Sequence, residues 1–177
     1  RGIVTISQAL ISSINTVAVQ LVDMVTPSYV YNFMIEKLHF TTFVEEDCDY
    51  APLGLGAITY GVTVREMAAA FGIFPNSGIY TETRLYSEIY SPEGELIFVN
   101  EPETNTAISD TTAYHMTRLM HNAASYGTGY EASFAGMPVA GKTGTGADNK
   151  DRWFCGFTPY YVAAVWVGYD RQTSISW

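Results

Sequence analysis

Apolar residues in the first eighty positions recur three and four residues apart, which is the spacing of one face of an α-helix. The pattern predicts a helix that begins at Thr5, is interrupted around residues 12–15 and resumes from Val17. Thr5 and Gln8 fit a capping box, in which the Thr5 hydroxyl caps the helix and the Gln8 side chain reaches back. The chain is therefore predicted to open with two short, consecutive helical segments.

Two further helices are predicted before residue 80. One starts at Thr26, with Pro27 at its first helical position. Its predicted buried stripe consists of Tyr29, Val30, Phe33, Met34 and Leu38. The other begins at Thr63, which forms a capping box with Glu66, and ends near residue 74. The N-terminal part of the chain is thus expected to be mainly helical.

The second half of the chain has mostly strand-like patterns. Residues 80–98 have the character of a hairpin whose turn is formed by residues 91–94. A helix capped by Ser109 or Asp110 follows and ends before Gly127. Three short segments rich in aromatic and β-branched residues then predict a run of three antiparallel strands, the first of which lies within residues 138–146.

Composition narrows the classes to which the protein can belong. The chain has 177 residues, of which 47% are hydrophobic and 15% charged, so it holds enough apolar material for one globular core. Its net charge of −9, without any basic cluster, argues against a nucleic-acid partner. No apolar run approaches the roughly 18 residues of a membrane span, so any membrane anchor would lie outside this chain.

Residues that commonly hold metal ions are poorly spaced for that role. Cys48 and Cys155 are far apart, and His115 and His121 do not share a helix face as a pair four apart would. The acidic run at residues 45–49 lacks the glycine and the alternate oxygens of a calcium loop. We expect a solvated loop there, and neither a metal ion nor a cofactor.

The segment 138–146 is the candidate edge of an active site. It brings Lys142, Thr143 and Thr145 onto a stretch bracketed by glycines, which remove side chains where a substrate backbone would lie close. An ammonium group and two hydroxyls together suit a carboxylate. If the segment begins the run of three strands, the site lies on the edge of a sheet.

Two other interpretations of this segment are open. Residues 136–143 fit the letter pattern of a phosphate-binding P-loop, which requires a helix to begin at the lysine. The residues after Thr143 predict strands, and only 34 residues follow it, too few for the rest of a nucleotide-binding sheet. An ordinary glycine-rich hairpin without a binding role also fits the pattern.

A second candidate site lies at the break in the first helical region. Serine and asparagine are poor residues inside a helix because their side chains compete for backbone hydrogen bonds. Ser13 and Asn15 are therefore either held for a chemical purpose or cap the junction between helix and loop. Their spacing favours neither interpretation.

A series of separated motifs runs through the chain in order. They are Ala9-Leu10-x-x-Ser13-x-Asn15-x-x-Ala18, Leu53-Gly54-x-Gly56, Gly61-Val62-Thr63-x-x-Glu66-Met67-Ala68, Pro75-Asn76-x-Gly78, Val139-Ala140-Gly141-Lys142-Thr143-Gly144-Thr145, Asp151-x-Trp153-Phe154-x-Gly156-Phe157-Thr158-Pro159 and Val165-Trp166-Val167-Gly168-Tyr169-Asp170. Together they resemble the transpeptidase domain of penicillin-binding proteins, most closely the bifunctional peptidoglycan synthases. The resemblance implies an α/β (α+β) fold of the penicillin-binding-protein and serine β-lactamase type. In that fold an antiparallel sheet of the C-terminal strands packs against a helical subdomain.

This family uses three motifs, Ser-x-x-Lys, Ser-x-Asn and Lys-Thr-Gly, and the first is missing here. The residues three positions before Lys37, Lys142 and Lys150 are Met34, Val139 and Ala147. The acylated serine is therefore expected upstream, and the chain is expected to be an incomplete domain. We expect residues 1–80 to be its mainly helical part, 81–108 a hairpin or loop, and 109–177 a helix, the Lys-Thr-Gly strand and two further strands.

The resemblance also implies roles for the two motifs that are present. Ser13 would relay a proton, Asn15 would hydrogen-bond the substrate amide, and Lys142 would supply positive potential and hold Ser13. The segment Thr143-Gly144-Thr145 would bind the substrate, with both threonine hydroxyls on its terminal carboxylate. The Thr145 N–H would be one oxyanion donor.

The function implied is cross-linking of peptidoglycan stem peptides by acyl transfer from D-Ala-D-Ala, with β-lactam antibiotics as mimics of that dipeptide. A D,D-carboxypeptidase, a serine β-lactamase and a relative that has lost its nucleophile and acts as a binding or scaffold module are the alternatives. The parent protein is expected to be anchored at the extracytoplasmic face of the bacterial cell membrane and fused to a glycosyltransferase domain.

Overall fold

A computed structural model describes residues 2–175. The helices are α1 (Ile6–Ile11), α2 (Asn15–Val25), α3 (Pro27–Glu36), α4 (Tyr50–Leu55), α5 (Val64–Gly72) and α6 (Asp110–Tyr126), with short 3-10 turns η1 (Glu45–Asp47), η2 (Tyr130–Ala132) and η3 (Ala147–Asn149). The strands are β1 (Ile79–Thr81), β2 (Glu88–Tyr90), β3 (Leu96–Val99), β4 (Thr104–Thr106), β5 (Ala140–Thr145), β6 (Asp151–Phe157) and β7 (Val162–Gly168). All pair antiparallel, as β1-β4, β2-β3 and β5-β6-β7.

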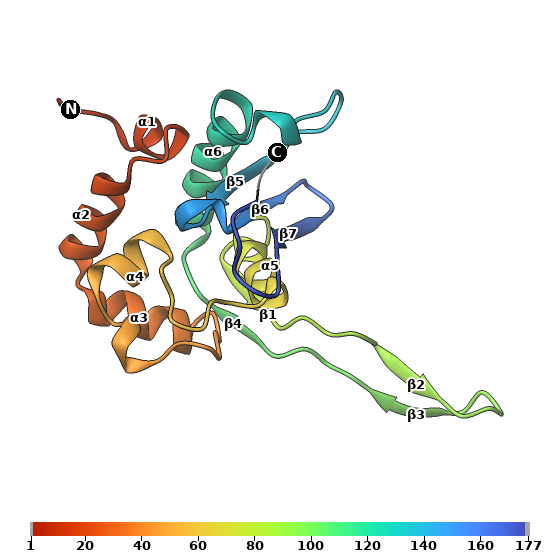
Figure 1. The fold of residues 1–177 in the computed structure, drawn as a ribbon. Helices are drawn as coiled ribbons and strands as arrows, with labels where there is room; N and C mark the ends of the chain where they lie inside the picture. Colours follow the sequence, from red (N-terminus) through yellow and green to blue (C-terminus); the bar gives the residue numbers. More distant parts are fainter. Residues whose placement is uncertain (1, 176–177) are drawn as a thin grey trace.

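The elements form two groups joined by loops (Figure 1). Helices α2, α3 and α4 lie together on one side, while α5, α6 and the sheet β5-β6-β7 lie on the other, with α1 beside α6. The hairpin β2-β3 projects away from both groups (Figure 1). The hairpin, its turn at residues 91–94 and the run of three C-terminal strands confirm the sequence predictions.

The helix starts follow the predicted capping residues, with one exception. Thr26 caps α3 by accepting a hydrogen bond from the Tyr29 N–H, and Thr63 and Glu66 form both halves of their capping box. The Thr5 hydroxyl accepts from the Gln8 N–H at 3.1 Å. However, the Gln8 side-chain amide donates to the Ser12 hydroxyl at 2.9 Å, so the reciprocal half of the first capping box is wrong. Gln8 instead spans one turn of α1, where Ser12 offers an acceptor on the same face.

The predicted buried stripe of α3 is only partly correct. Phe33 and Met34 pack against a core that includes Leu38, Phe40 and Ile73. Tyr29 remains 63% exposed because it lies one turn before this core and at the edge of the stripe. The helix therefore packs on the core through its C-terminal half.

Asp47 is the exception to the predicted solvated acidic loop, in which Glu45, Glu46 and Asp49 are exposed. Its side chain is fully buried and accepts hydrogen bonds from the Val44 N–H at 3.1 Å and from the Thr59 N–H and hydroxyl, each at 2.8 Å. Burial raises the pKa of this carboxyl, but the three hydrogen bonds outweigh it and hold the pKa below its usual value. Asp47 thus ties η1 to the loop that precedes α5, a contact that charge patterning alone does not indicate.

The sheet and α6 are joined by a small apolar core. Met120 of α6 packs with Ala140 and Phe157 of the sheet, and Phe74 stacks on Phe157 with ring centroids 6.2 Å apart. As predicted, α6 is capped by Ser109, whose hydroxyl accepts from the Thr112 N–H, and it ends before Gly127. Beside it, the Phe154 ring lies against the backbone of three glycines, at positions 129, 141 and 156.

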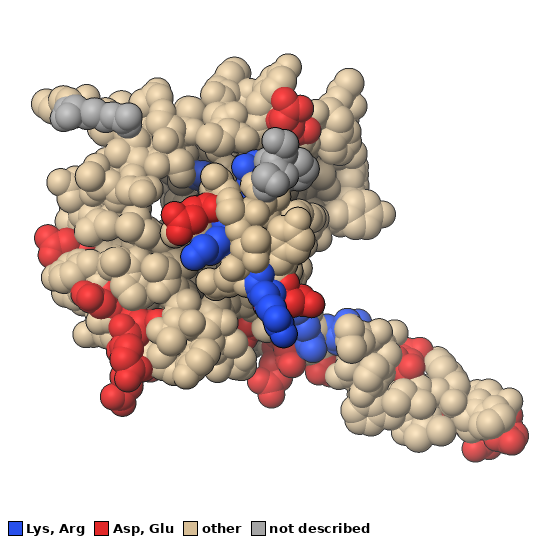
Figure 2. All heavy atoms as spheres, in the orientation of Figure 1, with Lys and Arg blue, Asp and Glu red and all other residues tan. Residues whose placement is uncertain are grey.

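Charged residues are unevenly spread over the face shown in Figure 2. Acidic side chains lie scattered over the helical part and at the tip of the hairpin. Lysine and arginine side chains are few there and lie mainly near the root of the hairpin. Within residues 2–175, no helix is both long and apolar enough to cross a membrane.

Gly141→Ala should destabilise the fold. An added Cβ would lie 2.7 Å from the Cys155 carbonyl oxygen and 2.8 Å from the Phe154 ring, so backbone or ring must shift. We expect a loss of about 1–3 kcal/mol in the free energy of unfolding, measured by urea denaturation. Gly72→Ala is the control, because nothing lies within 4 Å of its added Cβ at the end of α5. Equal stability of the two variants would contradict this packing.

Asp47→Asn should lower the free energy of unfolding by about 1–3 kcal/mol at pH 7. Both carboxylate oxygens of Asp47 accept hydrogen bonds, and the NH2 group of an asparagine cannot replace one of them as an acceptor. A lowered carboxyl pKa stabilises the fold above the unfolded pKa, near 3.9, and this contribution disappears as pH falls through the folded pKa. The difference from the unsubstituted chain should therefore shrink between pH 4 and pH 2 in denaturation experiments. Asp148→Asn, at an exposed side chain, serves as the control. A constant difference down to pH 2 would refute the role assigned to the Asp47 charge.

Candidate functional site

The strand β5 carries the candidate site on its unpaired edge. The Gly146 N–H donates to the Asp151 carbonyl at 3.0 Å, and hydrogen-bonded pairs alternate along an antiparallel ladder. In the register that pairs Thr145 with Arg152 and Thr143 with Phe154, the backbone groups of Thr143 and Thr145 therefore point away from β6. The sheet order leaves β5 without a partner on that side, so the predicted sheet edge is confirmed. Free N–H groups there can bind an oxyanion.

The side chains of β5 divide between the two faces of the sheet. Thr143 and Thr145 lie on one face, and Lys142 and Gly144 lie on the other. Lys142 is partly buried, and its ammonium donates to the Thr143 carbonyl at 2.9 Å. Burial lowers the pKa of Lys142 below its usual value. The strand thus presents a desolvated cation next to outward-facing backbone and hydroxyl groups.

Ser13 and Asn15 lie at the tight turn between α1 and α2. Ser13 adopts a left-handed backbone conformation, with φ of 50°, and Asn15 is the first residue of α2. Both side chains are exposed, and the cap position of α2 is occupied by Ile14 without any side-chain hydrogen bond. The interpretation of Ser13 or Asn15 as a helix cap is therefore wrong, and their polar groups remain available for a ligand.

This turn borders a hollow of about 850 Å³ along α1 and α2. Its apolar lining includes Ile3, Val4, Ile6, Ile14, Val17, Leu21 and Met24, next to the polar Ser13 and Asn15. Ser12, Thr16 and Gln20 also line it, so its wall is about as polar as it is apolar.

The Ser13 and Lys142 side chains are not joined directly. Within residues 2–175 no hydrogen bond links the two, and the lysine ammonium is occupied by the adjacent Thr143 carbonyl. The contact of Lys142 with Ser13 therefore stays a prediction. An ammonium has three donors, so two remain for further acceptors.

A threonine outside the predicted site residues joins this edge. The hydroxyls of Thr128 and Thr143 share a hydrogen bond between the connection after α6 and strand β5. In addition, the His121 Nδ1 bonds the Val139 carbonyl at 2.9 Å where the chain enters β5. The helix prediction places Gly127-Thr128-Gly129 only after the end of a helix, although two glycines around one hydroxyl residue are a signal of close backbone packing.

Other groups near the strand do not suit catalysis or metal binding. Cys155, paired with Lys142 in the ladder, is buried, and burial raises the pKa of its thiol to about 11, so it is not a nucleophile near neutral pH. Residues 142–145 form a strand, which excludes the P-loop because no helix begins at Lys142. In the described part of the chain, no three His, Cys, Asp or Glu residues gather as metal ligands.

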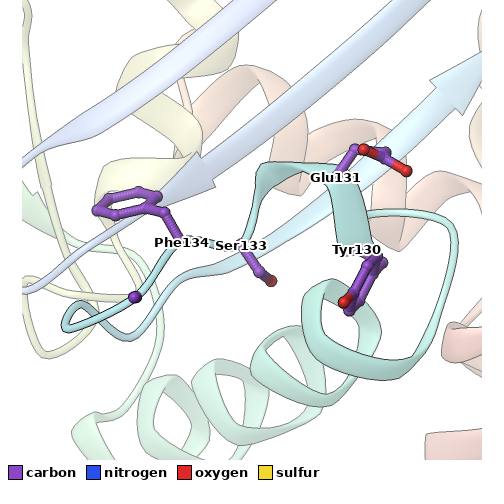
Figure 3. Close-up of a pocket in the computed structure, with 5 residues that line it drawn as sticks. Tyr130, Glu131, Ser133 and Phe134 are labelled. Atoms are coloured by element: carbon purple, nitrogen blue, oxygen red, sulfur yellow. The ribbon is translucent and has the colours of Figure 1, made fainter.

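A second hollow, of about 310 Å³, lies on the connection between α6 and β5 (Figure 3). It is lined by Tyr130, Glu131, Ser133, Phe134 and Ala135. The labelled side chains leave the connection in different directions (Figure 3), and none of the predicted site residues lines this hollow. It is therefore not the candidate site.

Lys142→Met should remove an increase in stability at alkaline pH. Since burial lowers the Lys142 pKa in the fold, the unfolded chain binds more protons between that value and about 10.4, and the free energy of unfolding rises with pH there. Urea midpoints at pH 8, 9 and 10 should rise less in Lys142→Met than in the unsubstituted chain. Lys150→Met, at a surface ion pair with Asp148, should keep the full increase. Parallel midpoints for all three proteins would refute a desolvated Lys142.

The comparisons with known proteins agree on one family. The family profile described as penicillin binding protein transpeptidase domain matches residues 1–171. Penicillin-binding protein 1A of Clostridium acetobutylicum is 43% identical over 176 residues, which cover 99% of this chain and 22% of that protein. The chain thus spans about a fifth of the length of this curated relative.

Two solved structures have the same fold. The penicillin-binding protein PonA1 from Mycobacterium tuberculosis superposes with a TM-score of 0.80 at 26% identity, covering 97% of this chain and 50% of that one. The D,D-transpeptidase domain of a peptidoglycan glycosyltransferase from Eggerthella lenta gives 0.74 at 25% identity, covering 92% and 47%. The predicted α+β fold of the penicillin-binding-protein type is confirmed. The chain belongs to the family of penicillin-binding protein transpeptidase domains.

Proposed function

We propose that this chain is part of a longer peptidoglycan D,D-transpeptidase that cross-links stem peptides through a serine acyl-enzyme. The observation that carries the proposal is the open edge of β5, where Lys142 and the outward-facing groups of Thr143 and Thr145 form a set of donors for an anion. Ser13 and Asn15, which do not cap a helix, add a hydroxyl and an amide on the turn that borders the larger hollow. Together these groups suit a peptide that ends in a carboxylate.

The proposed reaction has two steps. A serine upstream of this chain attacks the carbonyl of the penultimate D-alanine, and the C–N bond to the terminal D-alanine breaks after the nitrogen takes up a proton. An amine from a neighbouring stem peptide then attacks the ester and releases the serine. In both steps the carbonyl oxygen carries negative charge, which the Thr145 N–H would stabilise from the free edge of β5.

The side chains of the candidate site would each have a separate role in this reaction. The Ser13 hydroxyl would pass the proton between the nucleophile and the leaving amine, and Lys142 would supply positive potential and hold Ser13. Asn15 would hold the substrate amide. Thr143 and Thr145, on the same face of the strand, would donate to the terminal carboxylate. No cofactor or metal ion takes part in this scheme.

The names of the relatives support the wider setting. The curated relative is a penicillin-binding protein 1A, and one solved neighbour is the D,D-transpeptidase domain of a peptidoglycan glycosyltransferase. We propose that the parent protein likewise carries a glycosyltransferase domain and a membrane anchor, and works at the extracytoplasmic face of the cell membrane. Its partners would be stem peptides, with β-lactams as inhibitors.

A relative without a nucleophile would keep this pocket as a binding or scaffold module, and a D,D-carboxypeptidase would differ only in its acyl acceptor. Water replaces the amine in the carboxypeptidase, so the two enzymes give different products from the same donor. A serine β-lactamase would instead release the hydrolysed antibiotic rapidly.

The test is acylation of the full-length parent by benzylpenicillin, followed by intact-protein mass, with the 177-residue chain as the negative control. We expect an adduct on the parent alone, and a cross-linked dimer when a D-Ala-D-Ala pentapeptide is supplied with an acceptor amine. Lys142→Ala should slow acylation by at least about 100-fold, a loss typical of a residue in an acid–base relay. Lys150→Ala, which removes a surface lysine outside the site, should leave the rate unchanged.

Other results would redirect the proposal. No adduct on the parent would indicate a nucleophile-dead binding protein, and free D-alanine without a dimer would indicate a carboxypeptidase. An adduct on the 177-residue chain would mean that the serine lies within it.

A further inference from the structure

The connection after α6 places a third hydroxyl at the edge of β5. The Thr128 side chain is exposed, and its hydroxyl shares a hydrogen bond with that of Thr143, the first threonine after Lys142. These residues are 15 positions apart and belong to different elements, so the contact depends on tertiary packing.

Two glycines fix Thr128 in this place. A Cβ on Gly127 would lie 2.7 Å from the carbonyl oxygens of both Ala123 and Ile11, and a Cβ on Gly129 would lie 3.2 Å from the Ala124 Cα and 3.5 Å from the Phe154 ring. The backbone on either side of Thr128 is therefore wedged against α6 and β6. Because Ile11 is the last residue of α1, the same wedge touches the helix that leads into Ser13.

We infer that Thr128 is a positioning residue for the substrate carboxylate, acting through Thr143; this rests on the function proposed above. A carboxylate only accepts hydrogen bonds, while each threonine hydroxyl has one hydrogen and two acceptor lone pairs. When Thr143 donates its hydrogen to the carboxylate, its oxygen can accept from Thr128. Thr128 thus selects the Thr143 rotamer whose hydrogen faces the open edge of the strand.

The Thr128 hydroxyl should affect binding of the carboxylate but not the chemistry of acylation. Loss of the Thr128 hydroxyl leaves Thr143 free to rotate but removes no group that touches the reacting carbonyl. The effect should therefore appear only with ligands that carry the anion. A purely structural role would lower the reactivity toward all ligands alike.

The test compares acylation of the full-length parent by benzylpenicillin and by its methyl ester, which lacks the carboxylate charge. In Thr128→Val the rate constant for benzylpenicillin should fall about 3- to 10-fold, the effect of one neutral hydrogen bond, while that for the ester changes less than about 2-fold. Thr128→Ser, which keeps the hydroxyl, should restore the ratio of the two rates. Thr104→Val replaces an exposed threonine on β4 and should match the unsubstituted protein.

The outcomes separate this inference from the proposed function. If the unsubstituted parent reacts and Thr128→Val slows both compounds equally, or neither, the inference is wrong while the proposed function stands. If the unsubstituted parent reacts with neither compound, both are overturned. A ratio that falls in Thr128→Val and returns in Thr128→Ser supports the inference.

Discussion

The ring of Phe154 on three glycines is the contact on which the arrangement of the site depends. Its carbons lie near the positions that a Cβ would take on Gly141, Gly156 and Gly129, so one aromatic side chain spans β5, β6 and the connection after α6. Side chains on these glycines would push the three backbones apart, because protein interiors are close-packed. The contact therefore sets how near the connection after α6 comes to β5. Gly127 separately lets this connection lie close to Ile11 of α1.

This packing explains how one strand, β5, can present the groups proposed to bind the substrate. β6 pairs with one edge of β5, α6 packs against the strand, and no strand pairs with its other edge. Because hydrogen-bonded pairs alternate along the ladder, the N–H groups of β5 form two sets. The first set bonds to β6, and the second set remains free for a ligand. Thr143 and Thr145 belong to the second set. A shift of one residue in register would exchange the two sets and also move the threonines to the other face.

Local patterns predicted the fold well, whereas contacts between distant residues were not predictable. Thr26, Thr63 and Ser109 were found from capping chemistry because a cap needs only its own next three residues. Asp47 could not be recognised as buried, since its partner Thr59 is 12 positions away and acidic residues normally face water. In the candidate site, Lys142, Thr143 and Thr145 stand together on one glycine-bracketed segment, so their residue types alone indicate them. No local pattern links them to Thr128, whose hydroxyl meets that of Thr143 across 15 positions of sequence.

The electrostatic environment of the candidate site depends mainly on groups that touch the ligand and little on distant surface charges. The chain carries a net charge of −9, yet the proposed substrate end is an anion. Exposed acidic side chains farther from it than about 8 Å act weakly on it, because salt screens charges over that distance. Donors in contact with the carboxylate are not screened in this way, and a partly buried ammonium acts through a lower dielectric. One desolvated lysine with hydroxyl and N–H donors can therefore bind an anion in an acidic protein, at the cost of the lowered Lys142 pKa.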